Sequence, residues 1–416
     1  MAKSTAARLA VLGAGPIGLE AALYARNLGW PVTVYERGQA AEAVRHWGHV
    51  QLFTPFGMNH TKLGRRAILE SSRQHAFPAD SECITGWQHR EAYLEPLAAC
   101  GLLKGSLRVG TEVLAIGKCG LLKHEKPGDP KRAAQPFRLL LRDEKQRETT
   151  EEADVVLDCT GTYGRHRWLG EGGIPAGGER PARNLIAYGV EDVVGTRKQV
   201  YAGKGIMVVG GGYSAGTTIA NLAVLVQQHP EMWITWLMRL AVTQPLQRIP
   251  NDPFKGRDRL AANVNHLASR TDANIEFHSG AVIDSIEQMG EHGLKVTGRL
   301  AGKERSWEVD RMIANVGYSP DNDIFRELQV QESFSTLGPK GLADVLAKYP
   351  GCESAEIPPT GAESLRTPEP NFFVLGAKSF GRNSHFFMRY GFGQIREIFT
   401  LLTGTGDLDL YKAAAK

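Results

Sequence analysis

Two glycine-rich turns in this chain have the spacing that binds the phosphates of a dinucleotide. The first runs from Gly13 to Gly18 in RLAVLGAGPIGLEAALYARNLG, and the second runs from Gly210 to Ala215 in GIMVVGGGYSAGTTIANLA. Each follows an apolar strand and opens a helix. The three small residues of such a turn permit a sharp bend, a close approach of the backbone to a pyrophosphate, and tight packing of the helix on the strand. The helix N-terminus adds unpaired N–H groups for the phosphates.

The residues after the second strand of each unit predict which nucleotide is bound. Glu36 ends the strand PVTVYE, 18 residues after Gly18 (36 − 18). A carboxylate here accepts hydrogen bonds from ribose hydroxyls and repels a 2′-phosphate, so this site should bind FAD or NAD. In the second unit the strand WITWLMR ends on Arg239 where the acid would correspond. A guanidinium can hold a 2′-phosphate, which predicts NADPH; the alternative for Arg239 is a solvated residue at a strand end.

Two nucleotide sites with different ribose chemistry suggest two cofactors that exchange a hydride, one held permanently and one visiting. The elements that position them predict an α/β protein with two Rossmann-like dinucleotide-binding domains. The expected boundaries are a first part over 1–170, a second domain over 171–320, and a final segment over 321–416. The Gly/Pro-rich stretch 170–183 is expected to cross between domains. The final segment is expected to be loop-rich, with a strand NFFVLGA and a last helix from about Gly391 to Leu402.

Composition excludes several classes of protein. The 416 residues are 42% hydrophobic and 23% charged, with a net charge of +4, which is typical of a globular chain and gives no basic stripe for nucleic acid. Five cysteines form no C-x-x-C pair, which argues against a disulfide framework or a metal site and fits a reducing compartment. The first strand begins near Arg8, leaving no room for a signal peptide, and no apolar run is long enough to cross a bilayer. We therefore expect a cytoplasmic protein without membrane or nucleic-acid partners.

The chain resembles the flavoproteins with two dinucleotide-binding domains, which include flavin-containing monooxygenases, N-hydroxylating monooxygenases and thioredoxin reductase-like enzymes. The resemblance covers most of the chain, from Arg8 to about Thr403. It rests on GAGPIG with Glu36, ADVVLDCTGTYG, VVGGGYSAG, RMIANVGYSPD and NFFVLGA. It implies that the first turn holds FAD, and that the second, in a domain inserted within the FAD domain, holds NADPH. It also implies that the chain returns to the flavin near its end, and related proteins often form homodimers.

Departures from the family patterns reduce the number of candidate reactions. Disulfide reductases of this fold carry a cysteine pair beside the flavin and an Asp after the last strand's glycine, whereas here Ala377 and Lys378 follow Gly376. The Baeyer–Villiger fingerprint F-x-G-x-x-x-H is absent, because its only candidate has Leu260 in place of the histidine. The closest remaining class is a monooxygenase that oxidises an N or S atom of a small molecule with O2, through a flavin hydroperoxide. The alternatives are a flavin reductase or oxidase that passes electrons to a quinone, a disulfide or a protein, and a non-catalytic redox sensor.

Two irregular, aromatic segments, 46–60 and 379–390, are expected to line the flavin. An Asn amide in the first could bond both flavin and nicotinamide, although Asn59 could equally cap a turn. His385 and Arg389 are the candidates for a direct role in the second segment, with Arg389 facing the reduced flavin or an acidic substrate; Phe386, Phe387 and Phe392 are expected to be core. The residues predicted to bind cofactor are Gly13, Gly15, Pro16, Ile17, Gly18, Glu36, Arg37, Trp47, Thr160, Gly161, Gly210, Gly212, Tyr213, Ser214, Ala215, Arg239, Gly376 and Ser384.

Overall fold

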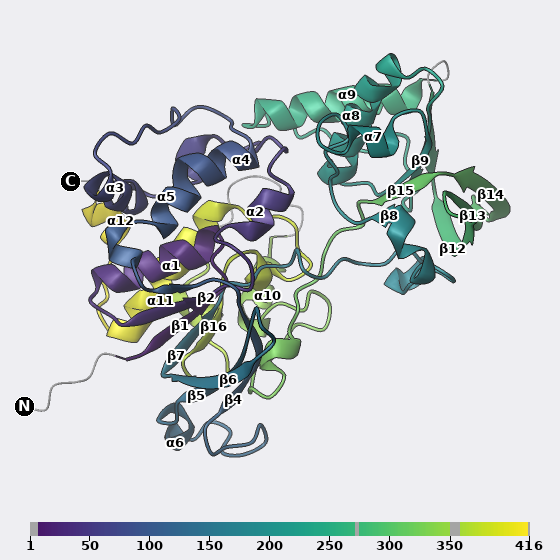
Figure 1. The fold of residues 1–416 in the computed structure, drawn as a ribbon. Helices are drawn as coiled ribbons and strands as arrows, with labels where there is room; N and C mark the ends of the chain where they lie inside the picture. The colour runs from purple at the N-terminus through teal and green to yellow at the C-terminus, as the bar shows by residue number, and fades with distance from the viewer. Residues whose placement is uncertain (1–6, 271–273, 350–357, 415–416) are drawn as a thin grey trace, which may run out of the picture. The chain divides into compact units, whose positions relative to one another are not determined.

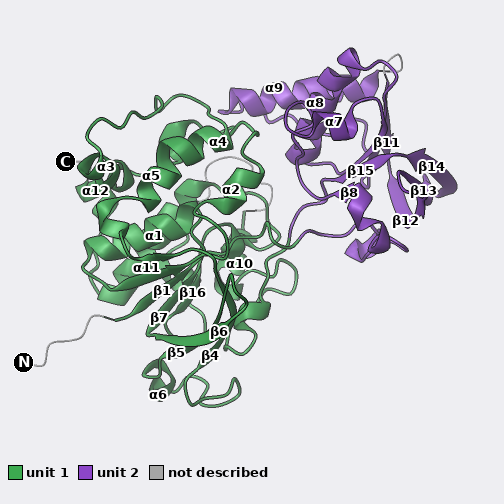
Figure 2. Cartoon of the chain, in the orientation of Figure 1, with its two compact units in different colours: residues 1–165, 319–416 green, residues 166–318 purple. Residues whose placement is uncertain are grey.

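The computed structural model describes residues 7–270, 274–349 and 358–414. The chain divides into two compact units (Figure 2). Unit 1 comprises residues 1–165 and 319–416, and unit 2 comprises residues 166–318. Unit 2 is therefore inserted into unit 1. The chain crosses between the units after Arg165 and again after Tyr318, whereas the sequence predicted these crossings at 170 and 320.

Unit 1 is built on a parallel sheet of five strands in the order β16-β7-β1-β2-β3. The strands are β1 (Leu9–Leu12), β2 (Val32–Tyr35), β3 (Leu107–Arg108), β7 (Val155–Asp158) and β16 (Phe372–Val374). Each residue of β1 and β7 is buried, as a strand covered on both faces requires. The last strand lies more than 200 residues after β7 in sequence yet pairs with it directly.

Two layers cover the faces of this sheet (Figure 1). Leu9 and Val11 point into a core shared with α1 (Pro16–Asn27), α3 (Lys62–Ser71) and α11 (Met388–Thr403). Their neighbours Ala10 and Leu12 point to the opposite face. That face packs on an antiparallel sheet of β4 (Thr111–Lys118), β5 (Phe137–Asp143) and β6 (Glu148–Ala153). Because successive side chains of a strand point to opposite faces, β1 contributes residues to two separate cores.

Unit 2 repeats this plan with its own cores. Its parallel sheet has the order β11-β10-β9-β15-β8, formed by β8 (Ile186–Ala187), β9 (Gly205–Val209), β10 (Trp233–Met238), β11 (Ile275–Ser279) and β15 (Arg311–Ala314). One face packs on α8 (Tyr213–Gln228) and α9 (Lys255–Ser269). The other packs on an antiparallel sheet of β12 (Ala281–Met289), β13 (Gly293–Leu300) and β14 (Lys303–Val309).

The remaining elements are short. They are α2 (Glu42–His46), η1 (Phe56–Met58), α4 (Gly86–His89), the π-helical η2 (Arg90–Leu94), α5 (Glu95–Ala98), η3 (Gly101–Leu103), α6 (Pro130–Ala133), η4 (Glu171–Gly173), η5 (Pro181–Leu185), α7 (Lys198–Tyr201), η6 (Asp323–Phe325), α10 (Lys340–Leu346), η7 (Ala362–Leu365), η8 (Gly376–Phe380) and α12 (Leu410–Ala413).

The stretch 170–183 does not cross between the units as expected. It lies inside unit 2, where the fully buried Glu179 carboxylate accepts hydrogen bonds from the amides of Leu169 and Ala176 and from the Tyr188 hydroxyl. The glycines and prolines of this stretch therefore shape a loop around one buried acid. Part of the predicted loop-rich segment, residues 350–357, lies outside the described residues.

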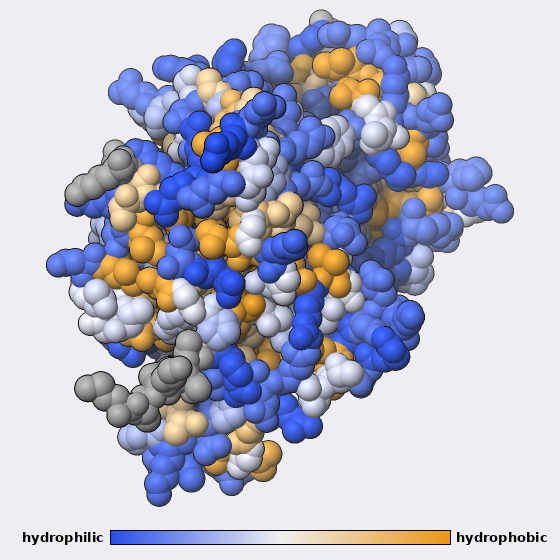
Figure 3. All heavy atoms as spheres, turned by 60° about the vertical axis from the view of Figure 1, so that its left-hand side comes forward, coloured by the Kyte–Doolittle hydropathy of each residue, from blue (hydrophilic) through white to orange (hydrophobic). Residues whose placement is uncertain are grey.

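No helix in the described part of the chain is both long and apolar enough to cross a membrane. On the face that Figure 3 brings forward, hydrophilic residues predominate and hydrophobic ones appear in small groups. An open surface groove of about 560 Å³ runs along α3, lined mainly by charged side chains. It includes Lys62, Arg65, Arg66 and Arg73, and none of the residues predicted to bind cofactor lines it.

Candidate functional site

The first glycine turn has the geometry of a phosphate cradle. Gly13 has φ +91°, a conformation that L side chains rarely adopt. A Cβ placed on Gly15 would find no atom within 4 Å, which leaves open space for a ligand at the second glycine. A Cβ on Gly18 would lie 1.9 Å from the Gly13 carbonyl oxygen, so only glycine allows α1 to pack this closely. Each glycine thus meets a different requirement of the turn.

Glu36 lies beside this turn at the end of β2. Its Oε2 accepts a hydrogen bond of 2.8 Å from the Ala14 amide, and its Oε1 accepts one of 2.9 Å from the Gly38 amide. Two backbone donors thus orient the carboxylate, which is partly exposed. A carboxylate has about four lone-pair positions, so each oxygen can still accept a ribose hydroxyl. Arg37 follows and is exposed, with its guanidinium close to Gly164.

The C-terminal segment returns to the same turn. Gly376 has φ +69°, and a Cβ placed on it would lie 3.2 Å from Ile17. A Cβ on Gly391, in the first turn of α11, would lie 2.3 Å from the same isoleucine. Gln394 accepts from the Gly376 amide at 2.9 Å and donates to Ser379 at 2.8 Å, which fixes η8 on α11. Ile17 and Gly376, both predicted cofactor residues, are therefore brought together.

The strand-end motif after β7 completes this edge of the sheet. Asp158 is level with Leu12 of β1 and Val374 of β16, so Cys159 and Thr160 lie next to the turn at Gly13. Gly161 has φ +70°. Because parallel sheets bind ligands at the carboxyl ends of their strands, these residues define the candidate site of unit 1.

Trp47 is placed near the same edge. Its ring lies 6.2 Å from that of Tyr163, which follows the strand-end motif, and it covers Gly86, where a Cβ would come within 2.6 Å. The Trp47 Nε1 atom is buried and finds no hydrogen-bond partner among the described residues. A buried N–H without an acceptor is costly, so the indole is a donor for which the described protein atoms supply no acceptor.

The side-chain amide of Asn59 is hydrogen-bonded within its own turn. The residue is only 2% exposed. Its Nδ2 donates to the carbonyls of Thr54 and Pro55, both at 3.1 Å, and its Oδ1 accepts from Thr54 Oγ1 at 2.9 Å. The amide therefore closes its own turn, which favours the turn-capping alternative.

A buried histidine that the sequence did not single out supports that turn. His89 Nε2 donates to the Asn59 carbonyl at 2.9 Å, and burial lowers the pKa of His89 to about 4. The ring is therefore neutral at physiological pH. The capping box at Thr85 could have located the start of this helix in the sequence. The hydrogen bond from His89 to Asn59 is a tertiary contact and carries no such local signal.

The second predicted segment leads into α11. Ser384 is exposed and His385 is half-buried, with its backbone amide bonded to Asn383 Oδ1 at 2.9 Å. Arg389 is half-buried, and its guanidinium lies 5.2 Å from the ring of Tyr390. Phe392 is 9% exposed and belongs to the unit 1 core. The direct roles of His385 and Arg389 stay predictions.

The second glycine turn repeats the first at the carboxyl edge of unit 2. Gly210 has φ +147°, and a Cβ on it would lie 2.4 Å from the Asn315 carbonyl oxygen. A Cβ on Gly212 would find no atom within 4 Å, and Ala215 is fully buried where Gly18 stands in the first turn. Tyr213 and the exposed Ser214 begin α8, whose N-terminus faces the turn.

The strand register corrects one detail of the sequence-based prediction. Gly13 donates to the Tyr35 carbonyl and Gly210 donates to the Leu237 carbonyl, so Glu36 corresponds to Met238. Arg239 lies one residue later, where unit 1 has Arg37. Met238 is 6% exposed and its side chain covers Gly211. The second site therefore has an apolar residue in the carboxylate's place and an exposed guanidinium beside it.

The described cysteines, Cys83, Cys100, Cys119 and Cys159, are all free. Cys159 adjoins the first turn, and burial together with the neighbouring Asp158 raises the pKa of its thiol well above the usual value. A protonated buried thiol is a poor nucleophile. Cys352 lies outside the described residues. Within the described ranges no group of three or more His, Cys, Asp or Glu side chains could hold a metal ion.

Comparisons with known proteins agree with this architecture. Residues 8–43, which hold the first glycine turn and Glu36, match the family model of pyridine nucleotide-disulphide oxidoreductases. No curated protein matches the chain in sequence. Among solved structures, the bacillithiol disulfide reductase Bdr (YpdA) from Bacillus cereus is similar with a TM-score of 0.66 and 18% identity, over 96% of this chain and 99% of that one.

A hydroxylase and a monooxygenase are similar at a comparable level. Ornithine hydroxylase (PvdA) from Pseudomonas aeruginosa has a TM-score of 0.62 and 14% identity, over 99% of this chain and 100% of that one. The cadaverine monooxygenase DfoA from Erwinia amylovora, solved with FAD, has a TM-score of 0.61 and 13% identity, over 96% and 95%. Reductases and monooxygenases thus share the fold at similar scores, and the fold does not separate their reactions. The chain therefore shares the two-unit fold of these enzymes.

Proposed function

We propose that this chain is an oxidoreductase that holds FAD in unit 1 and takes a hydride from NADPH bound in unit 2. One observation carries the proposal: the two glycine turns are alike in geometry, but the side chains that would contact the ribose differ in charge. Beside the first turn lies the oriented Glu36 carboxylate, and beside the second lie Met238 and the Arg239 guanidinium. A 2′-phosphate is repelled at the first site and attracted at the second.

The residues of unit 1 fit FAD. The open space at Gly15 and the N-terminus of α1 would hold the pyrophosphate, and Glu36 would hold the adenosine ribose. The unpartnered Trp47 N–H and the η8 turn beside Ile17 would border the rest of the cofactor. When bound, the flavin supplies the hydride acceptor and the site of oxygen activation. The protein's part is to bind, orient and exclude water.

We further propose that the reaction is the oxygenation of an N or S atom of a small molecule. In this reaction NADPH, a proton, O2 and the substrate yield NADP⁺, water and the oxygenated heteroatom. Support comes from Cys159, the described cysteine beside the turn, because burial raises the pKa of its thiol well above the usual value. A disulfide reductase needs a reactive thiolate near its flavin. The fold that the chain shares with PvdA and DfoA is compatible with this reaction.

The alternative is a reductase or oxidase that passes electrons to a quinone, a disulfide or a protein, and the fold that the chain shares with Bdr is equally compatible with it. Rapid mixing of the NADPH-reduced protein with O2 separates the two. A monooxygenase returns its oxidised flavin absorbance after a delay, releases little H2O2, and couples NADPH use to oxidation of an amine or sulfide. Immediate reoxidation with one H2O2 per NADPH would contradict oxygenation and favour the reductase or oxidase.

A further inference from the structure

A fully buried ion pair lies under the strand-end motif of unit 1. Lys378 Nζ is 2.6 Å from Asp158 Oδ2 and 3.0 Å from Thr160 Oγ1, and both charged side chains are 0% exposed. Asp158 Oδ1 accepts from the Thr160 hydroxyl at 2.7 Å and from the Thr160 amide at 3.1 Å. Three hydrogen bonds from the buried side therefore fix Thr160, although Thr160 itself is exposed.

Thr160 is directly beside the first glycine turn. A Cβ placed on Gly13 would lie 3.2 Å from the Thr160 Cα and 2.9 Å from the Cys159 carbonyl oxygen. Lys378 belongs to η8, whose first residue, Gly376, packs against Ile17 of the same turn. The ion pair thus joins the end of β7 to the returning C-terminal segment at the place where both meet the phosphate cradle.

Stability alone does not account for such a pair. Moving an ammonium and a carboxylate out of water costs more than their attraction commonly returns, and apolar side chains of similar size often stabilise a fold as well or better. What the charges add is direction, because hydrogen bonds to ionised groups are short and geometrically specific. Here these directional bonds converge on one exposed residue, Thr160.

We infer that Lys378 is a positioning residue for the flavin site: together with Asp158 it fixes Thr160 against the glycine turn and so slows the release of bound FAD. This inference rests on the proposed binding of FAD in unit 1. Lys378 itself is buried and touches no solvent, so it acts through Thr160 rather than by contact with the cofactor.

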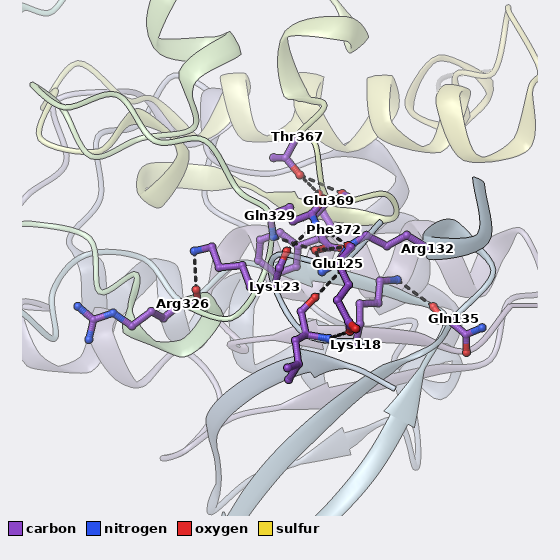
Figure 4. Close-up of polar contacts among 11 residues, drawn as sticks. Lys118, Lys123, Glu125, Arg132, Gln135, Arg326, Gln329, Thr367, Glu369 and Phe372 are labelled. Carbon is purple, nitrogen blue, oxygen red and sulfur yellow. Dashed lines mark hydrogen bonds and ion pairs between the residues drawn. The ribbon is translucent and has the colours of Figure 1, made fainter. Parts of the chain in front are cut away.

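The chain offers a matched control in a second buried ion pair (Figure 4). Arg132 Nη2 lies 2.7 Å from Glu369 Oε2, with side chains 1% and 0% exposed. Arg132 also donates to the carbonyls of Leu122 and Glu125, both at 3.0 Å. Glu369 precedes β16 whereas Lys378 follows it, so the two pairs lie at opposite ends of the same strand. The Arg132 pair is therefore as buried but remote from the turn.

The test compares Lys378→Met with Arg132→Met in the full-length holoprotein. FAD release is followed by the rise in free-flavin fluorescence after dilution, at one temperature at which the wild-type protein and both variants remain folded. We expect Lys378→Met to accelerate release at least about tenfold, the size expected for one lost hydrogen bond to a charge. Arg132→Met should stay within about twofold of the wild-type protein. Equal release rates for the two variants would overturn the inference.

Two further sets of variants cover a failure of Lys378→Met to fold. Thr160→Val keeps the buried pair but lacks the hydroxyl, so we expect it to release FAD faster than the wild-type protein. Thr160→Ser retains a hydroxyl and should restore the wild-type rate of release. The double variant Lys378→Leu, Asp158→Leu leaves no unpaired charge and should fold yet release FAD quickly. If Thr160→Val releases FAD at the wild-type rate, the inference about Lys378 is overturned while the proposed function stands. A wild-type protein that takes up no FAD overturns the proposed function, and the inference with it.

Discussion

At the scale of single residues, the two nucleotide sites differ in the side chains at the end of the second strand. In unit 1 the Glu36 carboxylate is oriented by the amides of Ala14 and Gly38. In unit 2 the same register position is Met238, and the next residue, Arg239, is exposed. An apolar residue neither attracts nor repels a 2′-phosphate, so the proposed preference of unit 2 for NADPH would depend on the neighbouring guanidinium.

Substitution of Arg239 tests that dependence. Arg239→Ala should raise the KM for NADPH about tenfold or more, because about 1.5–3 kcal/mol of charge-assisted bonding to the phosphate is lost. The KM for NADH should change little, since NADH has no 2′-phosphate. Steady-state kinetics with both nucleotides measures the ratio. Arg248→Ala is the control, because Arg248 is an exposed arginine of the same unit that pairs with Asp258 at 2.8 Å. If Arg239→Ala raised the KM equally for NADPH and NADH, the proposal that Arg239 binds the 2′-phosphate would be contradicted.

At the scale of elements, a buried acid holds the helices around the first turn. Glu20 of α1 is 0% exposed, and its carboxylate accepts hydrogen bonds from the hydroxyls of Tyr93 in η2 and of Thr61, which caps α3. Gly64 makes room, because a Cβ there would collide with the Tyr93 hydroxyl. Burial without a cation raises the pKa of Glu20 to about 7.

This raised pKa gives stability a defined pH dependence. The folded state binds a proton that the unfolded state releases near pH 4.5, so the free energy of unfolding falls as pH rises between about 4.5 and 7. The full loss is about 3 kcal/mol at about 1.4 kcal/mol per pKa unit. Glu20→Gln mimics the protonated acid and should be more stable than wild type at pH 8, by up to about that amount. Urea unfolding of both proteins at pH 8 and at pH 5 measures this difference in the free energy of unfolding. At pH 5 the wild-type protein and Glu20→Gln should nearly agree.

The result that would contradict these helix contacts is a Glu20→Gln variant as stable as wild type at pH 8. A variant less stable than wild type at both values would show instead that the ionised carboxylate is the stabilising form. In either case the coupling of α1 to α3 and η2 through a protonated acid would be wrong.

At the scale of the whole molecule, the two βαβ units were readable from the sequence because their signals are local. Strand, glycine turn and helix follow one another within about 30 residues, and both units have the predicted order. The antiparallel sheets were not readable as layers, since their strands are polar on one face. Tertiary pairings were also hidden: Asp158 and Lys378 are 220 residues apart, and Asn59 meets His89 only in the fold.

The insertion of unit 2 leads to a further prediction. Both hydrophobic cores of unit 2 are formed by residues of 166–318 alone. A protein of residues 166–318 should therefore fold by itself and unfold in one cooperative transition, as domains with their own core do. It should also retain affinity for 2′,5′-ADP, which carries the 2′-phosphate. Circular dichroism during heating, with and without this ligand, measures both. A gradual, ligand-independent melt would contradict the independence of the unit.

Hydride transfer from NADPH to the flavin is tested by an anaerobic titration of the purified, FAD-loaded protein with NADPH, followed by visible absorbance. We predict that about one NADPH bleaches one flavin, and that NADH does so only at far higher concentration, because the hydride donor is selected in unit 2 and the acceptor is held in unit 1. A protein that remains colourless after incubation with FAD, or whose bound flavin stays oxidised under excess NADPH, would contradict this transfer.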